Sequence, residues 1–179
     1  MASQQQASNT PLSVRDSWQT PEWLFWWADQ RFDFDFDLAA SAENAKVGAF
    51  FDIDDNALSQ NWYRAGANCW LNPPYSDPSP WQEKAWKEAQ NGVTTVLLIP
   101  TFNGDKYWGE HVYGKASEIT NIVGRVAFEL PNGDGTAKPV SGNPRGSCLV
   151  VYNRRYEGHT QLSWVNRDDM KAEYKEAMK

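Results

Sequence analysis

The sequence has little of what marks a secreted or membrane-spanning protein. No apolar run approaches the roughly 20 residues that span a bilayer. The opening segment MASQQQASNT also lacks the apolar core of a signal peptide. We therefore expect a protein of the cytoplasm that is not bound to a membrane. Residues 1–12 are polar and of low complexity, which favours a disordered N-terminal tail.

Cysteine and histidine are scarce, with two of each. Cys69 and Cys148 lie inside apolar, strand-like runs, which is typical of free buried thiols in an intracellular protein. His111 and His159 do not have the spacing of metal ligands, and the sequence contains no CxxC pair. These residues therefore predict no metal site.

The chain also lacks an excess of basic residues. Its formal net charge of −6 at pH 7 argues against binding nucleic acid over the whole surface. The charge is uneven, however: residues 16–55 hold ten acidic side chains against Arg31 and Lys46. From Lys138 to Tyr156 there are four basic side chains and no acidic one. This asymmetry is compatible with a local phosphate-facing surface, and equally with a solvated basic loop.

What the chain does have is an alternation of strand-like and helix-like segments, without an internal repeat or a linker. Apolar runs such as VTTVLLIP are typical of buried central strands, and SPWQEKAWKEAQ has the apolar spacing of an amphipathic helix. Thr20 is the expected N-cap of a helix that starts at Pro21. Strands are predicted over 32–37, 49–53, 68–71, 93–100, 118–130 and 147–153, and helices over 21–30, 41–48, 55–62, 79–92, part of 102–117 and 166–179.

This alternation predicts an α/β fold: a Rossmann-like, doubly wound, mostly parallel sheet in one small domain. The domain is expected over residues 13–160, with a C-terminal helical tail over 161–179. In such sheets, ligands bind beyond the carboxyl ends of the strands. Functional residues are therefore sought directly after the predicted strands.

The segment Asn72-Pro73-Pro74-Tyr75 follows the predicted strand 68–71. Two successive prolines stiffen the turn. The Asn72 side-chain oxygen and the Pro73 carbonyl can then both accept hydrogen bonds from one planar amino group. Tyr75 offers a flat face for stacking a base. This pattern favours transfer of a group onto an amino nitrogen; the alternative is a rigid proline turn that only caps the strand.

The NPPY segment is similar to the catalytic motif of amino-methyltransferases. Together with SWQTP, FDLAA, DDNALSQNW, LLIP and GRVAF, in that order around it, the chain resembles the phage DNA N6-adenine methyltransferase (Dam) family from about Trp18 to Tyr152. The resemblance implies a class I methyltransferase fold, S-adenosyl-L-methionine as methyl donor and adenine N6 in double-stranded DNA as target. It implies a catalytic set of Asn72, Pro73, Pro74 and Tyr75.

The resemblance also implies where the cofactor binds. The Thr-Pro segment before the first strand would contact the carboxylate of the cofactor, and a helix N-terminus is a suitable anion site. Asp37 would position the methionyl ammonium. An acid after the second predicted strand would bind the ribose hydroxyls or the adenine amino group of the cofactor. Asp52, Asp54 and Asp55 are the candidates, and Asp54 and Asp55 are favoured. The expected cofactor-binding residues are Thr20, Pro21, Asp37, Asp54, Asp55 and Asn72.

One departure from the family pattern concerns the loop after the first strand. The usual glycine loop (GxG) is missing, and Leu38-Ala39-Ala40-Ser41 stands in its place. Alanine permits close approach but cannot adopt the turns that glycine takes freely. The cofactor contacts of this loop are therefore open.

Three aspartates alternate with phenylalanines before this loop. Asp33, Asp35 and Asp37 would lie on one strand face, about 6.6–7 Å apart between neighbours, which is too far to share a metal ion without further ligands. We expect a solvated face with one cofactor acid, and no bound metal.

DNA contacts are expected from an insertion around residues 102–145. Most of the ten tryptophans are expected in the core. Two aromatic residues beside the expected cleft, and three basic residues, are the candidates for substrate contact. We expect a monomer or a weak dimer. The candidate DNA-binding residues are Tyr107, Trp108, Arg125, Lys138 and Arg145.

Two other classes of function are compatible with the sequence. The same motif occurs in methyltransferases that act on protein glutamine or on RNA. A non-catalytic protein, either a nucleic-acid-binding module or an acidic mimic, is favoured by the net charge and by the missing glycine loop. The intact NPPY segment argues against it.

Overall fold

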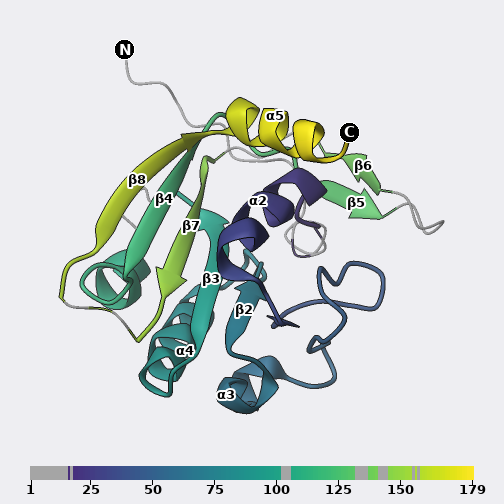
Figure 1. The fold of residues 1–179 in the computed structure, drawn as a ribbon. Helices are drawn as coiled ribbons and strands as arrows, with labels where there is room; N and C mark the ends of the chain where they lie inside the picture. The colour runs from purple at the N-terminus through teal and green to yellow at the C-terminus, as the bar shows by residue number, and fades with distance from the viewer. Residues whose placement is uncertain are drawn as a thin grey trace.

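The computed structural model describes Asp16 and residues 18–101, 106–131, 137–140, 145–154, 156 and 158–179. These residues form three layers, in which a central sheet is covered by helices on both faces (Figure 1). The predicted α/β fold with a mostly parallel sheet is confirmed. The predicted tail over 1–12 lies outside the described residues, as do segments 102–105, 132–136 and 141–144 of the predicted insertion.

The main sheet has six strands in the order β1-β2-β3-β7-β4-β8. The pairs β1-β2, β2-β3 and β4-β8 are parallel, whereas β7 runs antiparallel to both of its neighbours. All strands except β7 therefore run in one direction, and their carboxyl ends meet at one edge. The strands are β1 (Phe36–Asp37), β2 (Asn68–Leu71), β3 (Thr94–Pro100), β4 (Glu118–Val123), β7 (Ser147–Tyr152) and β8 (Gln161–Asn166).

A separate hairpin lies near α5 in Figure 1. It consists of β5 (Glu129–Pro131) and β6 (Ala137–Pro139), which pair antiparallel. An isolated bridge between Gln19 and Glu129 joins the start of the described chain to this hairpin. The hairpin therefore belongs to the carboxyl-end side of the molecule.

Helices α2 (Glu22–Phe32) and α5 (Arg167–Ala177) cover one face of the sheet. Leu24 and Phe25 of α2 and Met170 of α5 are buried in one cluster with the sheet residues Val96 and Leu98. The other face carries α4 and three short helical segments. Its core includes Ala85 and Ala89 of α4 with Leu97 and Ile99, the β3 residues that alternate with Val96 and Leu98. These elements are α4 (Ser79–Gln90), η1 (Ala57–Ser59), α3 (Trp62–Ala65) and the π-helix η2 (Trp108–Val112).

The strand predicted over 32–37 is wrong for its first four residues. Helix α2 continues to Phe32, and Asp33 has the left-handed backbone that ends it (φ 50°). The Asp35 carboxylate accepts hydrogen bonds from the backbone N–H groups of Ala67 and Asn68 at 2.9 and 3.1 Å. A Cβ on Gly66 would lie 2.3 Å from Asp35 Oδ1, so only glycine fits this close approach. Asp33 ends the helix and Asp35 binds the backbone of Ala67 and Asn68, and of this segment only Phe36 and Asp37 form strand.

The helix predicted over 41–48 and the strand predicted over 49–53 are also wrong. Residues 41–48 form turns and bends, in which the Ser41 N–H donates to Asn44 Oδ1 at 2.7 Å. Within 49–53 only Phe50 pairs with the sheet, through an isolated parallel bridge to Asp37. Polar side chains that bond locally to the backbone compete with regular structure in this segment.

The helical tail predicted over 161–179 is helical only from Arg167 to Ala177. Residues 161–166 instead form β8, which pairs in parallel with β4 at the edge of the sheet. The sequence QLSWVN is short and half polar, so it lacks the apolar run by which buried strands are recognised. The sheet therefore extends past residue 160.

Cys69 and Cys148 are both buried and free. In the described ranges, no helix combines the length and the apolar character needed to cross a membrane. The same ranges contain no cluster of three or more His, Cys, Asp or Glu side chains suited to a metal ion.

Candidate active site

The NPPY segment begins where β2 ends, at the carboxyl edge of the sheet. Strand β2 ends at Leu71, and Asn72 is half-buried. The Asn72 Nδ2 donates to the carbonyl of Trp18 at 3.1 Å. Asn72 Oδ1 is buried and has no hydrogen-bond partner among the described residues. A buried acceptor without a partner costs about 1–3 kcal/mol of stability, and this one lies at the edge of the sheet where α/β folds bind their ligands.

Tyr75 ends the segment with its ring packed inside an aromatic cluster. Its ring meets Phe128 edge to face, with centroids 5.6 Å apart. The hydroxyl is buried and has no partner among the described residues. Burial raises the pKa of Tyr75 well above its usual value, so the phenol is neutral. Phe128 in turn stacks on Trp18 at 5.5 Å.

A hollow of about 470 Å³ opens beside Tyr75. Two of the predicted DNA-binding residues, Tyr107 and Arg145, line it. Lys106, which the sequence did not single out, lines it as well and forms an ion pair with Glu110 at 3.0 Å. The structure therefore brings part of the predicted DNA-contact set next to the motif.

Trp108 does not belong to this set. Its side chain is 2% exposed and lies in the core between the sheet and α4. The expectation that Trp108 contacts the substrate is wrong for this conformation, because a buried indole cannot reach DNA. Its neighbour Tyr107 starts the same helical segment but faces the hollow.

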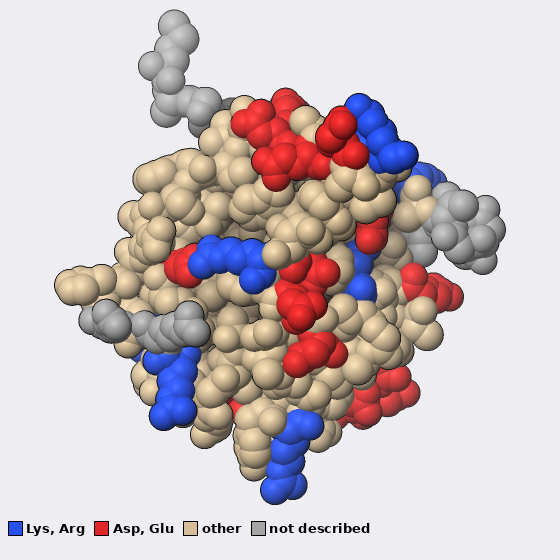
Figure 2. Space-filling view, in the orientation of Figure 1, with Lys and Arg blue, Asp and Glu red and all other residues tan. Residues whose placement is uncertain are grey.

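Arg125 and Lys138 are exposed and do not line the hollow. The Arg125 carbonyl accepts a hydrogen bond from Arg167 Nη1 at 2.8 Å, and Lys138 lies on β6. On the face shown in Figure 2, basic side chains stand singly among acidic ones and form no continuous basic surface. Any DNA contact on this face is therefore local.

Asp37 ends β1, next to β2 in the sheet, and is 3% exposed. Its carboxylate accepts hydrogen bonds from the backbone N–H groups of Lys46 at 3.1 Å and Ala39 at 3.3 Å. Burial raises the pKa of Asp37 to about 6, although these two hydrogen bonds act in the opposite direction. Asp37 pairs with Trp70 in the register, so this carboxylate and Asn72 lie at the ends of adjacent strands.

The loop after β1 does not need glycine. Outside the glycines, the described residues with positive φ are Asp33 and Asn56, so Leu38–Ser41 takes backbone conformations that alanine adopts freely. The Ala39 N–H is held by Asp37. The departure from the family's glycine loop therefore introduces no backbone strain.

Thr20 is buried but is not the N-cap of the helix. The cap is Pro21, whose carbonyl accepts from the N–H groups of Leu24 and Phe25 at 3.0 and 3.2 Å. The predicted helix start is thus displaced by one residue. Thr20 directly precedes Pro21, the N-cap of α2.

The three acids after Phe51 lie in an exposed turn. Asp52 Oδ1 accepts from the N–H groups of Asp54 and Asp55 at 2.9 and 3.1 Å. Asp55 Oδ2 accepts from the Asp52 N–H at 2.9 Å. The carboxylates of Asp52 and Asp55 therefore stabilise the turn, and the bridge from Phe50 to Asp37 ties it to the end of β1.

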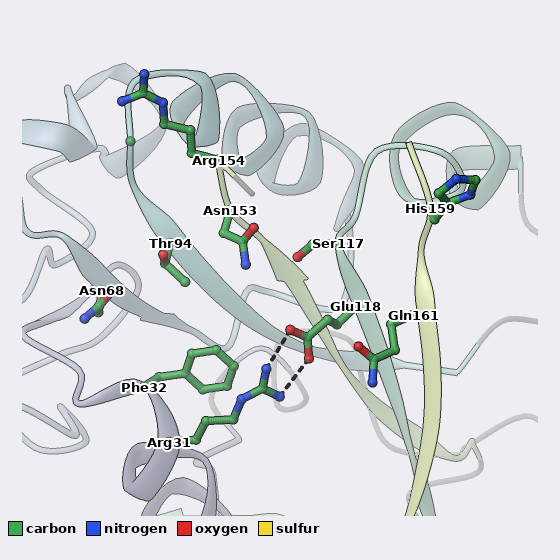
Figure 3. A pocket seen from close by; sticks show the side chains of 11 residues that line it. Arg31, Phe32, Asn68, Thr94, Ser117, Glu118, Asn153, Arg154, His159 and Gln161 are labelled. Atoms are coloured by element: carbon green, nitrogen blue, oxygen red, sulfur yellow. Dashed lines mark hydrogen bonds and ion pairs between the residues drawn. The ribbon is translucent and has the colours of Figure 1, made fainter. Parts of the chain in front are cut away.

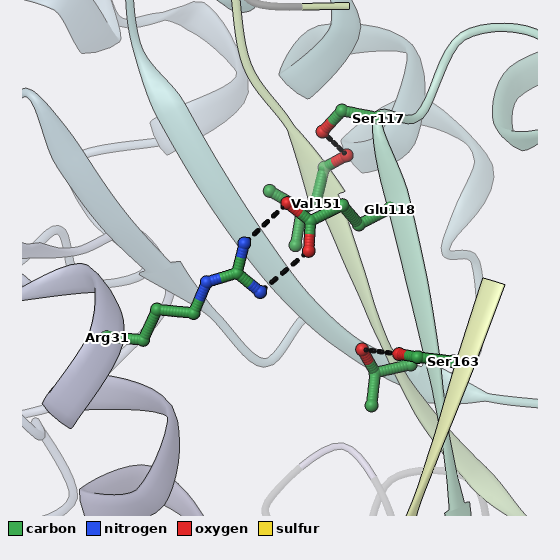
Figure 4. Close-up of polar contacts among 6 residues, drawn as sticks. Arg31, Ser117, Glu118, Val151 and Ser163 are labelled. Atoms are coloured by element: carbon green, nitrogen blue, oxygen red, sulfur yellow. Dashed lines mark hydrogen bonds and ion pairs between the residues drawn. The ribbon is translucent and has the colours of Figure 1, made fainter. Parts of the chain in front are cut away.

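A larger hollow, of about 640 Å³, lies at the opposite edge of the sheet (Figure 3). It is lined by residues at the beginnings of β2, β3, β4 and β8 and at the end of β7. Arg31 and Glu118 form a two-pronged ion pair across it at 2.7 and 2.6 Å (Figure 4). Ligands of open α/β sheets bind at the carboxyl edge, which argues against a catalytic site here.

The sequence did not predict the aromatic cluster around Tyr75, although two of its members lie in segments that carry the family resemblance. Trp18 and Phe128 stand inside the segments SWQTP and GRVAF that carry the family resemblance. Nothing in their local pattern shows that they meet, because they lie far apart in the sequence. Only the folded chain places both beside the NPPY segment.

The mixed α/β sheet, with helices on both faces, is consistent with the class I methyltransferase fold. The family model of DNA N-6-adenine-methyltransferase (Dam) matches residues 7–176. The chain belongs to this family. Its members methylate adenine N6 in DNA, and the chain is an adenine-specific DNA methyltransferase.

Individual relatives agree with this membership. The chain is 33% identical over 167 residues to a DNA N-6-adenine-methyltransferase of Haemophilus phage HP1, covering 92% of this chain and 94% of the relative. It is 31% identical over 169 residues to a protein of the same name from Escherichia phage T1, covering 86% and 69%. A putative methyltransferase YfdM of Escherichia coli K12 is 37% identical over 73 residues, covering 38% and 76%.

Proposed function

We propose that the chain transfers the methyl group of S-adenosyl-L-methionine to adenine N6 in double-stranded DNA, with the NPPY segment as the catalytic centre. The observation that carries this proposal is the buried Asn72 Oδ1, which has no partner among the described residues. It is an acceptor held ready for an amino hydrogen. The Pro73 carbonyl would accept the second hydrogen of the same amino group.

The residues around β1 fit the proposed methyl donor. Asp37 is a buried carboxylate at the end of a strand, and such a group is stabilised in its charged form by a cationic ligand such as the methionyl ammonium. Thr20 and Pro21 stand at the N-terminus of α2, where a ligand carboxylate is favoured. The exposed turn with Asp54 and Asp55 would hold the ribose or adenine portion. When bound, the donor supplies an electrophilic methyl group on a positively charged sulfur.

The residues of this chain then hold the target. Adenine N6 is not accessible inside a stacked duplex, so the base must be flipped out at a cost of a few kcal/mol. Stacking on Tyr75 would return about 1–3 kcal/mol of that cost. Asn72 and Pro73 align the N6 lone pair with the methyl carbon, which accelerates the reaction through positioning.

The bond changes are balanced without a protein intermediate. The donor would supply the methyl group: as N6 bonds to the methyl carbon, the sulfur would keep the electron pair of the carbon–sulfur bond that breaks. N6 then loses one proton to solvent. Asn72 and the Pro73 carbonyl stabilise the positive charge that develops on the amino group.

Tyr107 and Arg145, which line the hollow beside Tyr75, are proposed to contact the DNA strand that carries the target. Lys106 at the same hollow is added to this set. Arg125 and Lys138 are proposed as outer contacts with phosphates. We further propose that the enzyme acts in the cytoplasm as a monomer or weak dimer.

The test is transfer of a labelled methyl group to duplex DNA, RNA and cell lysate in parallel. We expect label in DNA, at adenine N6, and its loss in Asn72→Ala. The matched control is Asn68→Ala, a half-buried asparagine at the other end of the same strand. Label in RNA or in protein glutamine instead, or equal activity of the two variants, would contradict the proposal.

A further inference from the structure

A short N-terminal segment contacts both ends of the NPPY segment. This strap consists of Asp16, Trp18 and Gln19. Asp16 Oδ1 accepts from the backbone N–H of Ser76 at 3.1 Å, directly after the motif. The Trp18 carbonyl accepts from Asn72 Nδ2 at 3.1 Å, at the start of the motif.

The contact with Trp18 decides how the Asn72 amide is turned. An amide side chain has a donor end and an acceptor end, whereas a backbone carbonyl only accepts. The Asn72 NH2 must therefore face Trp18, and the oxygen is left as the end that meets no partner in the part of the chain that the structure describes. Rotation of the amide by half a turn would set two acceptors against each other. The strap thus leaves an acceptor available for the target.

The indole of Trp18 also contacts Tyr75, at the other end of the motif, indirectly through Phe128. Trp18 is 5% exposed and stacks on Phe128, with an angle of 16° between the rings. Phe128 is 1% exposed and meets the Tyr75 ring edge to face. Gln19 and Glu129 exchange two backbone hydrogen bonds, at 2.8 and 3.0 Å, which fix the strap beside Phe128.

We propose that Trp18 is a positioning residue of the methyl transfer, which holds Asn72 with its oxygen toward the target and holds Tyr75 through Phe128. Asp16 assists by fixing the chain after Tyr75. Neither side chain touches the reacting atoms. This inference rests on the proposed catalytic role of Asn72 and Tyr75.

The test is a single-turnover measurement of methyl transfer with saturating donor and DNA. Trp18→Ala should slow transfer about 10–100-fold, because small displacements of a catalytic group have effects of this size. Trp18→Phe keeps a stacking ring and should recover most of the rate. Asp16→Ala should slow transfer a few-fold, and Asp16→Asn, which still offers an acceptor to Ser76, should not. Donor affinity should stay within about threefold in all four variants.

Two comparisons distinguish a positioning role of Trp18 from a role in stability alone. Trp62→Ala removes another fully buried indole, whose Nε1 donates to the Ala57 carbonyl on the opposite face of the sheet. It should lower the melting temperature but leave the rate per folded molecule unchanged. Trp18→Ala keeps the backbone carbonyl but removes the indole that packs the strap against Phe128. On an Asn72→Ala background it should therefore have a smaller effect than on the wild type, because the part that acts through the position of the Asn72 amide is already lost.

Two results would overturn the inference. One is a Trp18→Ala rate, per folded molecule, equal to that of Trp62→Ala. The other is full additivity of Trp18→Ala and Asn72→Ala. Failure of the wild-type chain to methylate adenine in any duplex would instead refute the proposed function itself.

Discussion

The two edges of the same sheet differ in how their polar groups are satisfied. At the carboxyl edge, Asn72 Oδ1 and the Tyr75 hydroxyl are buried and lack partners among the described residues. At the amino edge, the larger hollow is open and polar, and Arg31 and Glu118 fully engage each other. The larger hollow therefore lies at the amino edge, whereas the unpartnered Asn72 Oδ1 and Tyr75 hydroxyl lie at the carboxyl edge. The carboxyl edge is where α/β sheets bind ligands, so unpartnered polar atoms there are a better sign of function than volume alone.

The largest effect is expected at Asn72. Asn72→Ala should lower turnover about 10²–10³-fold, by analogy with the loss of one preorganised hydrogen-bonding group. Donor affinity should change far less, because the side chain faces the target amino group. Single-turnover kinetics and calorimetry measure the two quantities separately. Near-normal transfer would move the chemistry away from this edge of the sheet.

Asp37 gives the carboxyl edge a dependence on pH. Its pKa is raised from 3.8 to about 6 by burial. Between these values the folded chain holds a proton that the unfolded chain has lost. The contribution of Asp37 to the free energy of unfolding should therefore fall by about 3 kcal/mol as the pH rises from 4 to 6, and then stay level. Denaturation across this range, compared with Asp37→Asn, tests the slope, which the variant should lose.

Donor binding should show the opposite trend with pH if Asp37 faces the methionyl ammonium. The cation favours the carboxylate, so binding releases a proton below pH 6. Affinity should rise as the pH approaches 6 and level off above it. Calorimetry in buffers of different ionisation enthalpy measures the released proton. A flat profile in the wild type would remove Asp37 from the donor site.

Two variants at Tyr75 distinguish the effect of its ring from the effect of its hydroxyl. Tyr75→Ala should weaken capture of the flipped base about 5- to 160-fold, which corresponds to the 1–3 kcal/mol of base stacking. Tyr75→Phe should keep the ring and most of the activity. Fluorescence of 2-aminopurine at the target position reports the flipped base. Equal losses in both variants would assign the role to the hydroxyl instead.

Smaller effects are expected from the basic side chains. Arg145→Ala should weaken DNA binding for every sequence and lower the salt slope by about one, as one phosphate contact is lost. Arg125→Ala should act in the same way at its own, outer site. An unchanged affinity and slope in the double variant would place the DNA surface elsewhere.

The smallest effect should come from the amino edge. The Arg31 side chain is 59% exposed and that of Glu118 16%, so their ion pair should contribute no more than about 1 kcal/mol. Arg31→Ala should leave methylation, DNA affinity and salt slope unchanged. Loss of methylation in this variant would show that the two edges are coupled.

The sequence was most informative where one signal was enough. NCWL, VTTVLLIP and the helix from Ser79 were predicted well, because an apolar run or a 3.6-residue period is bounded by turn residues. It was least informative over 33–53, where Asp35 and Asp52 bond to nearby or distant backbone rather than extend a strand. Strand β8 was missed because it is an exposed edge strand.

The site divides in the same way. The position of Asn72 at the end of β2 could be predicted, because the apolar strand and the prolines after it are local signals; its catalytic role stays a prediction. Its contact with Trp18 spans 54 residues of sequence and has no local pattern. Trp108 was misplaced because an aromatic residue beside a cleft can face either the cleft or the core. Which way the Trp108 side chain points depends on the helical segment that carries it, the π-helix η2.

The position of β7 has a consequence for how the chain acquires its structure. β7 lies between β3 and β4, and it pairs Tyr152 with Thr95 and Val151 with Glu118. The two halves of the sheet therefore cannot join until the ribosome has released the chain beyond Tyr152. Until then, β3 and β4 each present an open hydrogen-bonding edge. Such late, distant pairing slows folding, and a nascent chain that ends before Ser147 should be prone to aggregation.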